Sequence, residues 1–395
     1  MFLLGGFFWW RYLRLEENVE RAINRVETGE LAQEETVVLR ALLAARLAEN
    51  PVVALSILRE LRNRGEAETE DLVLFVELTL DFADVPPEED AFAELERRAP
   101  DDPRTKTLRA RLFFGQGFRK KALAMLEVLL GQEPENRYVR LAKARMLWRS
   151  ASLDDRILAK ITLRELGAGT DVLAHKALKA LAFTPLGNGV FPEDVLEAAV
   201  GLRRHPLTNP AVLLRAIEIG LAFAEPAERE SLSDEASKRL RGTDKAMLAQ
   251  WFLGRGEHRR TLELVSEVEA KRSSKLFFPR FQALLETNAT IQAEALLERA
   301  ISVLSAEEQA KAAAYFDLAR GDPTVVAKYL SRAKATRSAV ALVEAGRLAI
   351  LSGDGTSARE AYTAALDIDS NALDQDEGNQ LLQLALSARE TPLAL

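Results

Sequence analysis

Short helix-forming segments recur along this chain at a nearly constant interval, and that interval is the strongest constraint on its fold. The second segments of successive helix pairs recur at Ala54, Ala91 and Ala122 and then at Thr261, Ala293, Val326 and Ala358. Within each group they lie roughly 31–37 residues apart, and such a period indicates stacked units that cover one another's apolar faces. Because alanine, leucine, glutamate and arginine are abundant, the pattern predicts an all-α fold, an α-solenoid of antiparallel helix pairs.

The clearest unit spans Ser338–Asn371. It has a tight turn at Ser352-Gly353-Asp354-Gly355, small residues at Gly346, Ala358 and Ala365, and the large Tyr362. Small residues let two helices approach closely, and a large side chain fills the space between them. A turn glycine permits the positive φ that ends a helix. The pattern therefore predicts two closely packed helices.

A second unit, Pro103–Asn136, carries the same features, with Ala110, Ala122, the turn residue Gly117 and a closing Pro134. In both units the pattern resembles the tetratricopeptide repeat (TPR), a helix–turn–helix motif of about 34 residues. The resemblance implies a right-handed superhelix. Weaker copies are expected at Asp244–Ser273, Ser274–Leu304 and Gln309–Thr336, with turns at Gly256, Asn288 and Gly321.

These signals predict five parts of the chain: a hydrophobic segment 1–14, N-terminal repeats 15–182, an irregular helical middle 183–243, C-terminal repeats 244–371, and a final part 372–395, with a capping helix at Leu381–Ala388 and a tail. The strongest break lies in the proline- and glycine-rich stretch from Thr184 to Pro192. It fits either a loop in a continuous superhelix or a hinge between two halves. We favour the loop, since solenoids accept insertions on one face.

Residues that carry out catalysis are scarce. The chain has no cysteine, which excludes thiolate chemistry and cysteine metal sites. His175, His205 and His258 are far apart in the sequence and lack metal-ligand spacing, and the last two fall near turns where a surface position is expected. No phosphate-binding loop or nucleophile motif is present. We therefore expect a non-catalytic protein with no metal and no cofactor.

The charge of the chain reverses between neighbouring units. Residues 65–102 hold 14 acidic and 2 basic residues, whereas residues 103–150 hold 12 basic and 3 acidic residues. The TPR resemblance implies that the first helix of each pair lines a concave groove. It places seven candidate partner-binding residues there: Arg104, Arg111, Phe114, Tyr138, Arg145, Trp148 and Arg149. Arginine and aromatic side chains are enriched in binding hot spots.

A competing interpretation makes Phe114 and Trp148 core residues and lets the arginines balance the acidic unit beside them. Some TPR proteins grip the C-terminal carboxylates of peptides with asparagines at the positions that Arg111 and Arg145 hold here, so that specificity does not carry over. The arginines instead predict a protein partner with an acidic or anionic segment.

The function predicted from these features is a scaffold that binds a partner protein in its groove. The alternative is RNA binding by the basic stretch 103–150, against which the net charge of −7 argues. The uncharged run from Met1 to Trp10, followed by arginines, is typical of a membrane boundary. We expect residues 1–14 to contact a membrane, or else to pack on the first helix pair. Localisation is accordingly membrane-associated through the N-terminus, or cytoplasmic.

Overall fold

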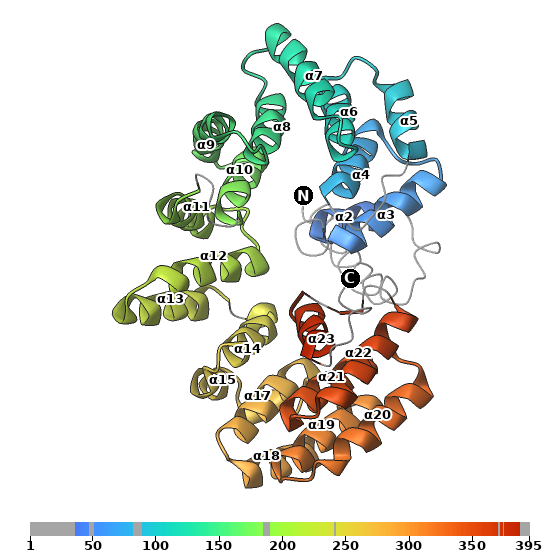
Figure 1. The fold of residues 1–395 in the computed structure, drawn as a ribbon, viewed down its shortest axis with the longest axis vertical. Helices are drawn as coiled ribbons and strands as arrows, with labels where there is room; N and C mark the ends of the chain where they lie inside the picture. The colour runs from blue at the N-terminus through green and yellow to red at the C-terminus, as the bar shows by residue number, and fades with distance from the viewer. Residues whose placement is uncertain are drawn as a thin grey trace, which may run out of the picture. The chain divides into compact units, whose positions relative to one another are not determined.

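The computed structural model describes residues 36–46, 51–81, 89–184, 190–240, 242–369, 372–373 and 375–387. They form two compact units, Met1–Ala236 (unit 1) and Ser237–Leu395 (unit 2). Both units are built from helices (Figure 1), so the prediction of an all-α fold is confirmed. The segment 1–14 lies outside the described residues. Within the described ranges, every helix is too short or too polar to cross a membrane.

Unit 1 is a succession of helix pairs. Its helices are α2 (Thr36–Arg46), α3 (Pro51–Asn63), α4 (Thr69–Asp81), α5 (Glu89–Arg98), α6 (Pro103–Gly115), α7 (Arg119–Gln132), α8 (Arg137–Trp148), α9 (Leu153–Gly167), α10 (Val172–Ala182), α11 (Pro192–Arg204), α12 (Pro210–Phe223) and α13 (Pro226–Arg239), whose last residues belong to unit 2. In Figure 1, α9 and α11 lie outside α8 and α10, so the even-numbered helices share the inner side of this unit.

Unit 2 is also a succession of helix pairs, and its first helices along the chain are shorter than the later ones. Its elements are the 3₁₀ turn η2 (Gly242–Asp244), α14 (Lys245–Gly254), α15 (His258–Leu264), α16 (Glu267–Ala270), α17 (Ser274–Glu286), α18 (Thr290–Ala300), α19 (Ala306–Ala319), α20 (Thr324–Thr336), α21 (Ala339–Ser352), α22 (Gly355–Ile368) and α23 (Gln375–Ser387). The helix α23 lies in the region of the predicted capping helix, and it begins before the expected Leu381.

Side-chain caps and turn residues set where the helices begin and end. The Asp102 carboxylate accepts a hydrogen bond from the Arg104 N–H, and Pro103 occupies the first helical position of α6. Between α6 and α7, Gly117 has φ +88°. Between α17 and α18, Asn288 has φ +57°, in the left-handed region that asparagine tolerates better than most residues. The predicted turn positions are therefore confirmed.

The pair α21–α22 shows how small and large residues fit together. Tyr362 of α22 is fully buried, and its ring lies directly over Gly346 of α21. A Cβ atom on Gly346 would overlap that ring. The close approach predicted from the Ser338–Asn371 pattern is thus present, because only glycine leaves room for the tyrosine.

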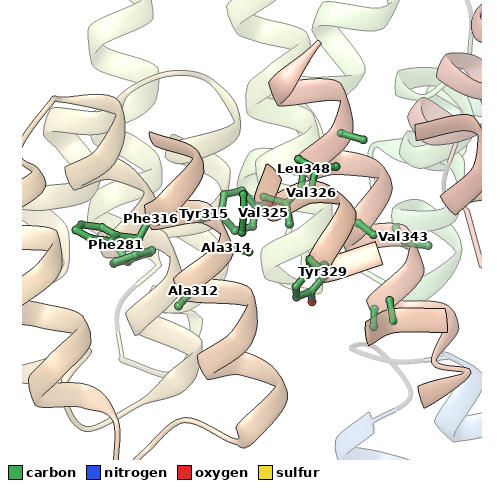
Figure 2. Close-up of a cluster of buried hydrophobic side chains, with 14 of the residues drawn as sticks. Phe281, Ala312, Ala314, Tyr315, Phe316, Val325, Val326, Tyr329, Val343 and Leu348 are labelled. Carbon is green, nitrogen blue, oxygen red and sulfur yellow. The ribbon is translucent and has the colours of Figure 1, made fainter. Parts of the chain in front are cut away.

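Each unit has its own hydrophobic interior. In unit 2 a single cluster of buried side chains runs from Ala249 to Ala365. Figure 2 shows part of it, with Phe281, Tyr315, Leu348 and their neighbours contributed by successive helices. In unit 1 the buried residues form separate clusters, centred on α2–α5, on α6–α8 and on α8–α12. Neighbouring pairs therefore stabilise one another along the stack, as in other repeat proteins.

Candidate partner-binding surface

One position carries a charged residue in four successive first helices of unit 1. Glu77 of α4, Arg111 of α6, Arg145 of α8 and Lys179 of α10 follow one another at a constant step of one repeat. The same step separates Glu70 from Arg104, and Arg137 from Asp171. Because the repeat is regular here, these side chains fall on the same face of successive inner helices. We call Glu77, Asp81, Arg111, Arg145, Lys176 and Lys179 the inner charge line.

Two carboxylates of α4, those of Glu77 and Asp81, form the ion pairs of the inner charge line. Arg111 Nη2 lies 2.6 Å from Asp81 Oδ1, and its Nη1 lies 3.7 Å from Glu77 Oε1. Arg145 Nη2 reaches the same Asp81 oxygen at 2.9 Å. Lys176 of α10 places its Nζ 2.6 Å from Glu77 Oε1. Two of the predicted binding residues, Arg111 and Arg145, are therefore brought together, and both are paired with the acidic unit beside them.

The inner charge line has more positive than negative charge. Four cations surround two carboxylates, and Lys179 forms no ion pair with any residue that the structure describes. Burial lowers the pKa of Lys179, and the cations of Arg145, Lys176 and Arg215 add to that effect while Asp81 opposes it. Burial alone would raise the pKa of Asp81, but Arg111, Arg145 and Lys176 outweigh it, so the pKa lies below its usual value.

The other predicted residues lie around this line in different environments. Arg104 is bound by Glu70 at 2.6 Å and by Asp102 at 2.7 Å. The indole N–H of Trp148 donates to Thr184 Oγ1 at 2.7 Å, and the side chain is 8% exposed within the core of unit 1. Trp148 is thus a core residue, as the competing interpretation had it.

Phe114 and Tyr138 are half-buried, and Arg149 is exposed. Arg119 lies over the Phe114 ring at 5.6 Å. Burial next to Glu77 raises the pKa of the Tyr138 hydroxyl, which places it beside the inner charge line. Arg149 has no ion pair within the described parts of the chain. Of the aromatic candidates, Phe114 and Tyr138 therefore border the surface, whereas Trp148 is covered.

Sequence reasoning missed Glu77, Asp81, Lys176 and Lys179. The one-repeat step that links Arg111 to Arg145 also leads to Glu77 and Lys179, so this part of the line could have been found. Lys176 and Asp81 lie off that step. The inclusion of Lys176 depends on how far the stack curves, because its contact with Glu77 joins residues 99 apart.

A second charged group lies on the corresponding helices of unit 2, and it is balanced. Glu344 of α21 accepts from Lys311 at 2.8 Å, from Arg347 at 2.8 Å and from the Tyr315 hydroxyl at 3.2 Å. Arg347 also binds Glu377 of α23 at 2.7 Å. Two cations meet two carboxylates, which leaves no surplus charge.

Beside this group, unit 2 has an open, mostly apolar pocket of about 330 Å³. Its walls include Leu253 of α14, Leu285 of α17, and Ile350 and Leu351 of α21. Leu351 is 60% exposed, which is unusual for a leucine that lines a hollow. The polar residues at its edge are His258, Gln282, Glu286, Tyr315, Arg347 and Gln380. The pocket therefore suits an apolar side chain with polar groups around it.

The histidines differ from their sequence-based interpretation. His205 is 5% exposed, so the expected surface position is wrong, because the turn after α11 folds back against α10. Its ring lies 5.1 Å from that of His175. Across the residues that the structure describes, no three histidine or acidic side chains gather where they could hold a metal ion.

Comparisons with known proteins find similarity to solved structures but to no family model. No protein-family model matches the chain, and no curated protein does. A solved chain from the APC/C hetero-tetramer Cut9–Hcn1 is similar at 12% identity, with 96% of this chain and 83% of that chain covered and a TM-score of 0.28. The P58(IPK) TPR domain is similar at 15% identity, with 82% and 99% covered and a TM-score of 0.21.

The packing within the chain itself decides the fold. Helix pairs repeat at steps of about one TPR length, positive-φ residues close the turns, and a glycine of one helix receives a tyrosine of the next. Each unit is a TPR-like stack. In such a stack the first helices of the pairs share one face, which is where the inner charge line of unit 1 and the pocket of unit 2 are found.

Proposed function

We propose that this chain is a non-catalytic scaffold that binds an acidic segment of a partner protein on the inner charge line of unit 1. The observation that carries the proposal is the surplus of cations: among the residues that the structure describes, the inner charge line sets the four cations of Arg111, Arg145, Lys176 and Lys179 against two carboxylates. An uncompensated group of like charges is costly, and carboxylates from a partner would relieve the repulsion.

The members of the line contribute differently to this function. The Arg111 side chain is only 13% exposed and binds both carboxylates, so it supports the line from within. Arg145 and Lys176 are 31% and 27% exposed and can share their donors with a ligand. Lys179 has no ion pair with a described residue and is the first contact that we assign to the partner. Arg104 and Arg149 extend the basic surface on either side.

The small excess of positive charge on the inner charge line favours a partner protein over RNA. The line exceeds its carboxylates by two charges, whereas nucleic-acid binding proteins neutralise many phosphates along a continuous basic face. Beyond the line, Arg104 is itself paired with Glu70 and Asp102, which limits the basic surface further. A short acidic peptide segment matches such a restricted surface.

The test uses the full chain and a fluorescein-labelled peptide of ten glutamates, read by fluorescence polarisation. We expect Lys179→Glu to weaken binding by about tenfold or more, since one favourable contact is replaced by a repulsive one. Lys120→Glu on α7 is the matched control: Lys120 is exposed, carries the same charge and lies outside the line. It should change binding by less than about twofold.

Equal losses in the two variants would contradict the proposal, because they would indicate nonspecific attraction. A single-stranded RNA oligomer that binds more tightly than the peptide, with the same dependence on Lys179, would assign the surface to nucleic acid instead.

We further propose that residues 1–14 bring the scaffold to a membrane. The support is in the sequence: an uncharged run that ends in Phe7-Phe8-Trp9-Trp10 and is followed by Arg11. Co-flotation of the full chain with neutral phosphatidylcholine vesicles should be lost when residues 1–14 are deleted. Persistence of co-flotation in the deletion variant would remove this part of the proposal.

A further inference from the structure

Two histidines meet where α10, α11 and α12 join in unit 1. His175 lies on α10, and His205 is the residue that caps the end of α11. Their ring centroids are 5.1 Å apart and the rings are tilted by 35°. The Nε2 atoms of both rings are buried and have no hydrogen bond of good geometry to any described residue. Such buried polar atoms are uncommon in folded proteins and call for a physical reason.

His205 is also part of the turn that leads into α12. Its Nδ1 accepts a hydrogen bond from the Leu207 N–H at 3.2 Å. The same turn is closed by the Thr208 hydroxyl, which donates to the Leu202 carbonyl at 2.6 Å. Because Nδ1 is an acceptor here, the neutral ring carries its proton on Nε2. A second proton would have to go to Nδ1 and would break the bond to Leu207.

The charged groups around the pair act differently on the two rings: cations face His175, whereas the group that faces His205 is acidic. Lys176 and Lys179 lie on α10 itself, next to His175. Burial lowers the pKa of His205, and Asp171, at the start of α10, partly opposes that effect through its charge and its backbone, although its carboxylate is also bound by Arg137 of α8. On α11, the neighbouring Arg203 binds Glu235 of α13 at 2.8 Å. An added proton is therefore disfavoured by burial and by Lys179 at His175, and by burial at His205.

We propose that the His175–His205 pair is an acid-sensitive latch that holds the α10–α11–α12 joint closed while both rings are neutral. A proton on His205 removes the Leu207 hydrogen bond, and a proton on His175 places a charge in a buried site beside Lys176 and Lys179. The joint then opens locally. This inference stands apart from the proposed function. Opening would nevertheless also disturb Lys176 and Lys179, because α10 carries them.

The pH range follows from the direction of the pKa shifts. Burial, with Lys179 and His205 nearby, lowers the pKa of His175 to about 4, and burial lowers that of His205. An unfolded histidine has a pKa near 6.5. Since the folded form binds protons less readily than the open form, the joint is fully stable above about pH 6.5 and weakens as the pH falls from there toward 4.

The test is amide hydrogen exchange of the full chain at pH 7.5 and pH 5.0, corrected for intrinsic exchange rates. We expect protection of α10–α12 to fall by about tenfold or more at pH 5.0, while α19–α22 change little. The double variant His175→Phe with His205→Asn should lose this difference, because the introduced asparagine can still accept from the Leu207 N–H and neither new side chain titrates. His258→Asn, in unit 2, is the matched control and should behave like the wild type.

Two outcomes would overturn the latch. One is an unchanged acid response in the double variant. The other is imidazole titration of both histidines near pH 6.5 in the folded wild type, followed by NMR, and this measurement remains decisive even where the double variant fails to fold.

Discussion

The Lys176 ammonium lies 2.6 Å from the Glu77 carboxylate, although 99 residues separate the two in the chain. The contact joins α10 to α4, three repeats away, while most other ion pairs of the inner charge line join neighbouring first helices. Glu77 therefore forms ion pairs with both Arg111 and Lys176. The stack of unit 1 curves enough to bring α10 back to α4, although α6 and α8 lie between them in the order of inner helices.

Removing Arg111 should destabilise unit 1. In Arg111→Leu, the buried Glu77 and the more exposed Asp81 lose a shared cation, and we expect a loss of about 2 kcal/mol in the free energy of unfolding, less than for a fully buried pair. Urea unfolding followed by circular dichroism measures it. The control is Lys106→Leu, whose partner Asp101 is almost fully exposed, and it should cost less than about 0.5 kcal/mol. Equal effects would show that Arg111 has no special structural role.

Acid should weaken the same line through Asp81. Its pKa is lower in the folded chain than in the unfolded chain, because Arg111, Arg145 and Lys176 outweigh the effect of burial. The ion pairs therefore add stability above the unfolded pKa, and this contribution disappears as the pH falls through the lower folded value. Between pH 5 and 2.5, Asp81→Asn should lose less stability than the wild type. Parallel pH profiles would be evidence against this prediction.

Gly346→Ala should disrupt the α21–α22 pair, since the new methyl group overlaps the Tyr362 ring. Overpacking of this kind costs about 1–3 kcal/mol. The matched substitution is Gly131→Ala in α7, where a Cβ meets nothing within 4 Å, and it should stabilise the chain by about 0.5–1 kcal/mol. Thermal unfolding of both variants measures the contrast. Tyr362→Leu should make Gly346→Ala less harmful, because the two positions share one space.

The pocket of unit 2 should bind an apolar probe. Leu351→Glu places a negative charge at its wall that repels the sulfonate of 1-anilinonaphthalene-8-sulfonate, so the fluorescence of this dye with the folded chain should fall several-fold. Val340→Glu puts the same residue on the same helix at a position that is 72% exposed and outside the pocket, and the signal should hardly change. A similar decrease in both variants would mean that the dye binds elsewhere.

Local features of the chain were predictable because local chemistry decides them. The turns at Gly117 and Asn288 follow from their tolerance of positive φ, and the Gly346–Tyr362 contact follows from a small and a large residue at fixed spacing. The position of Trp148 was ambiguous, since an indole suits both a core and a binding surface.

Long-range features were beyond sequence reasoning. The Lys176–Glu77 contact depends on the accumulated curvature of three repeats, to which many small packing differences contribute. The burial of His205 depends on how the turn after α11 folds back on α10. The residue pattern predicts neither the curvature of the stack nor the path of this turn. Only the one-repeat step between Arg111 and Arg145 indicated a longer row of charged residues.

The spacing of these pairings also bears on how the chain acquires its structure. Contacts such as Arg104–Glu70 close loops of about one repeat, so each helix pair can form on its predecessor with a low contact order, as in rapidly folding helical proteins. The Lys176–Glu77 contact closes a loop roughly three times longer, which costs about 1 kcal/mol more in chain entropy. That salt bridge should therefore form late, after the repeats between its two ends have already stacked.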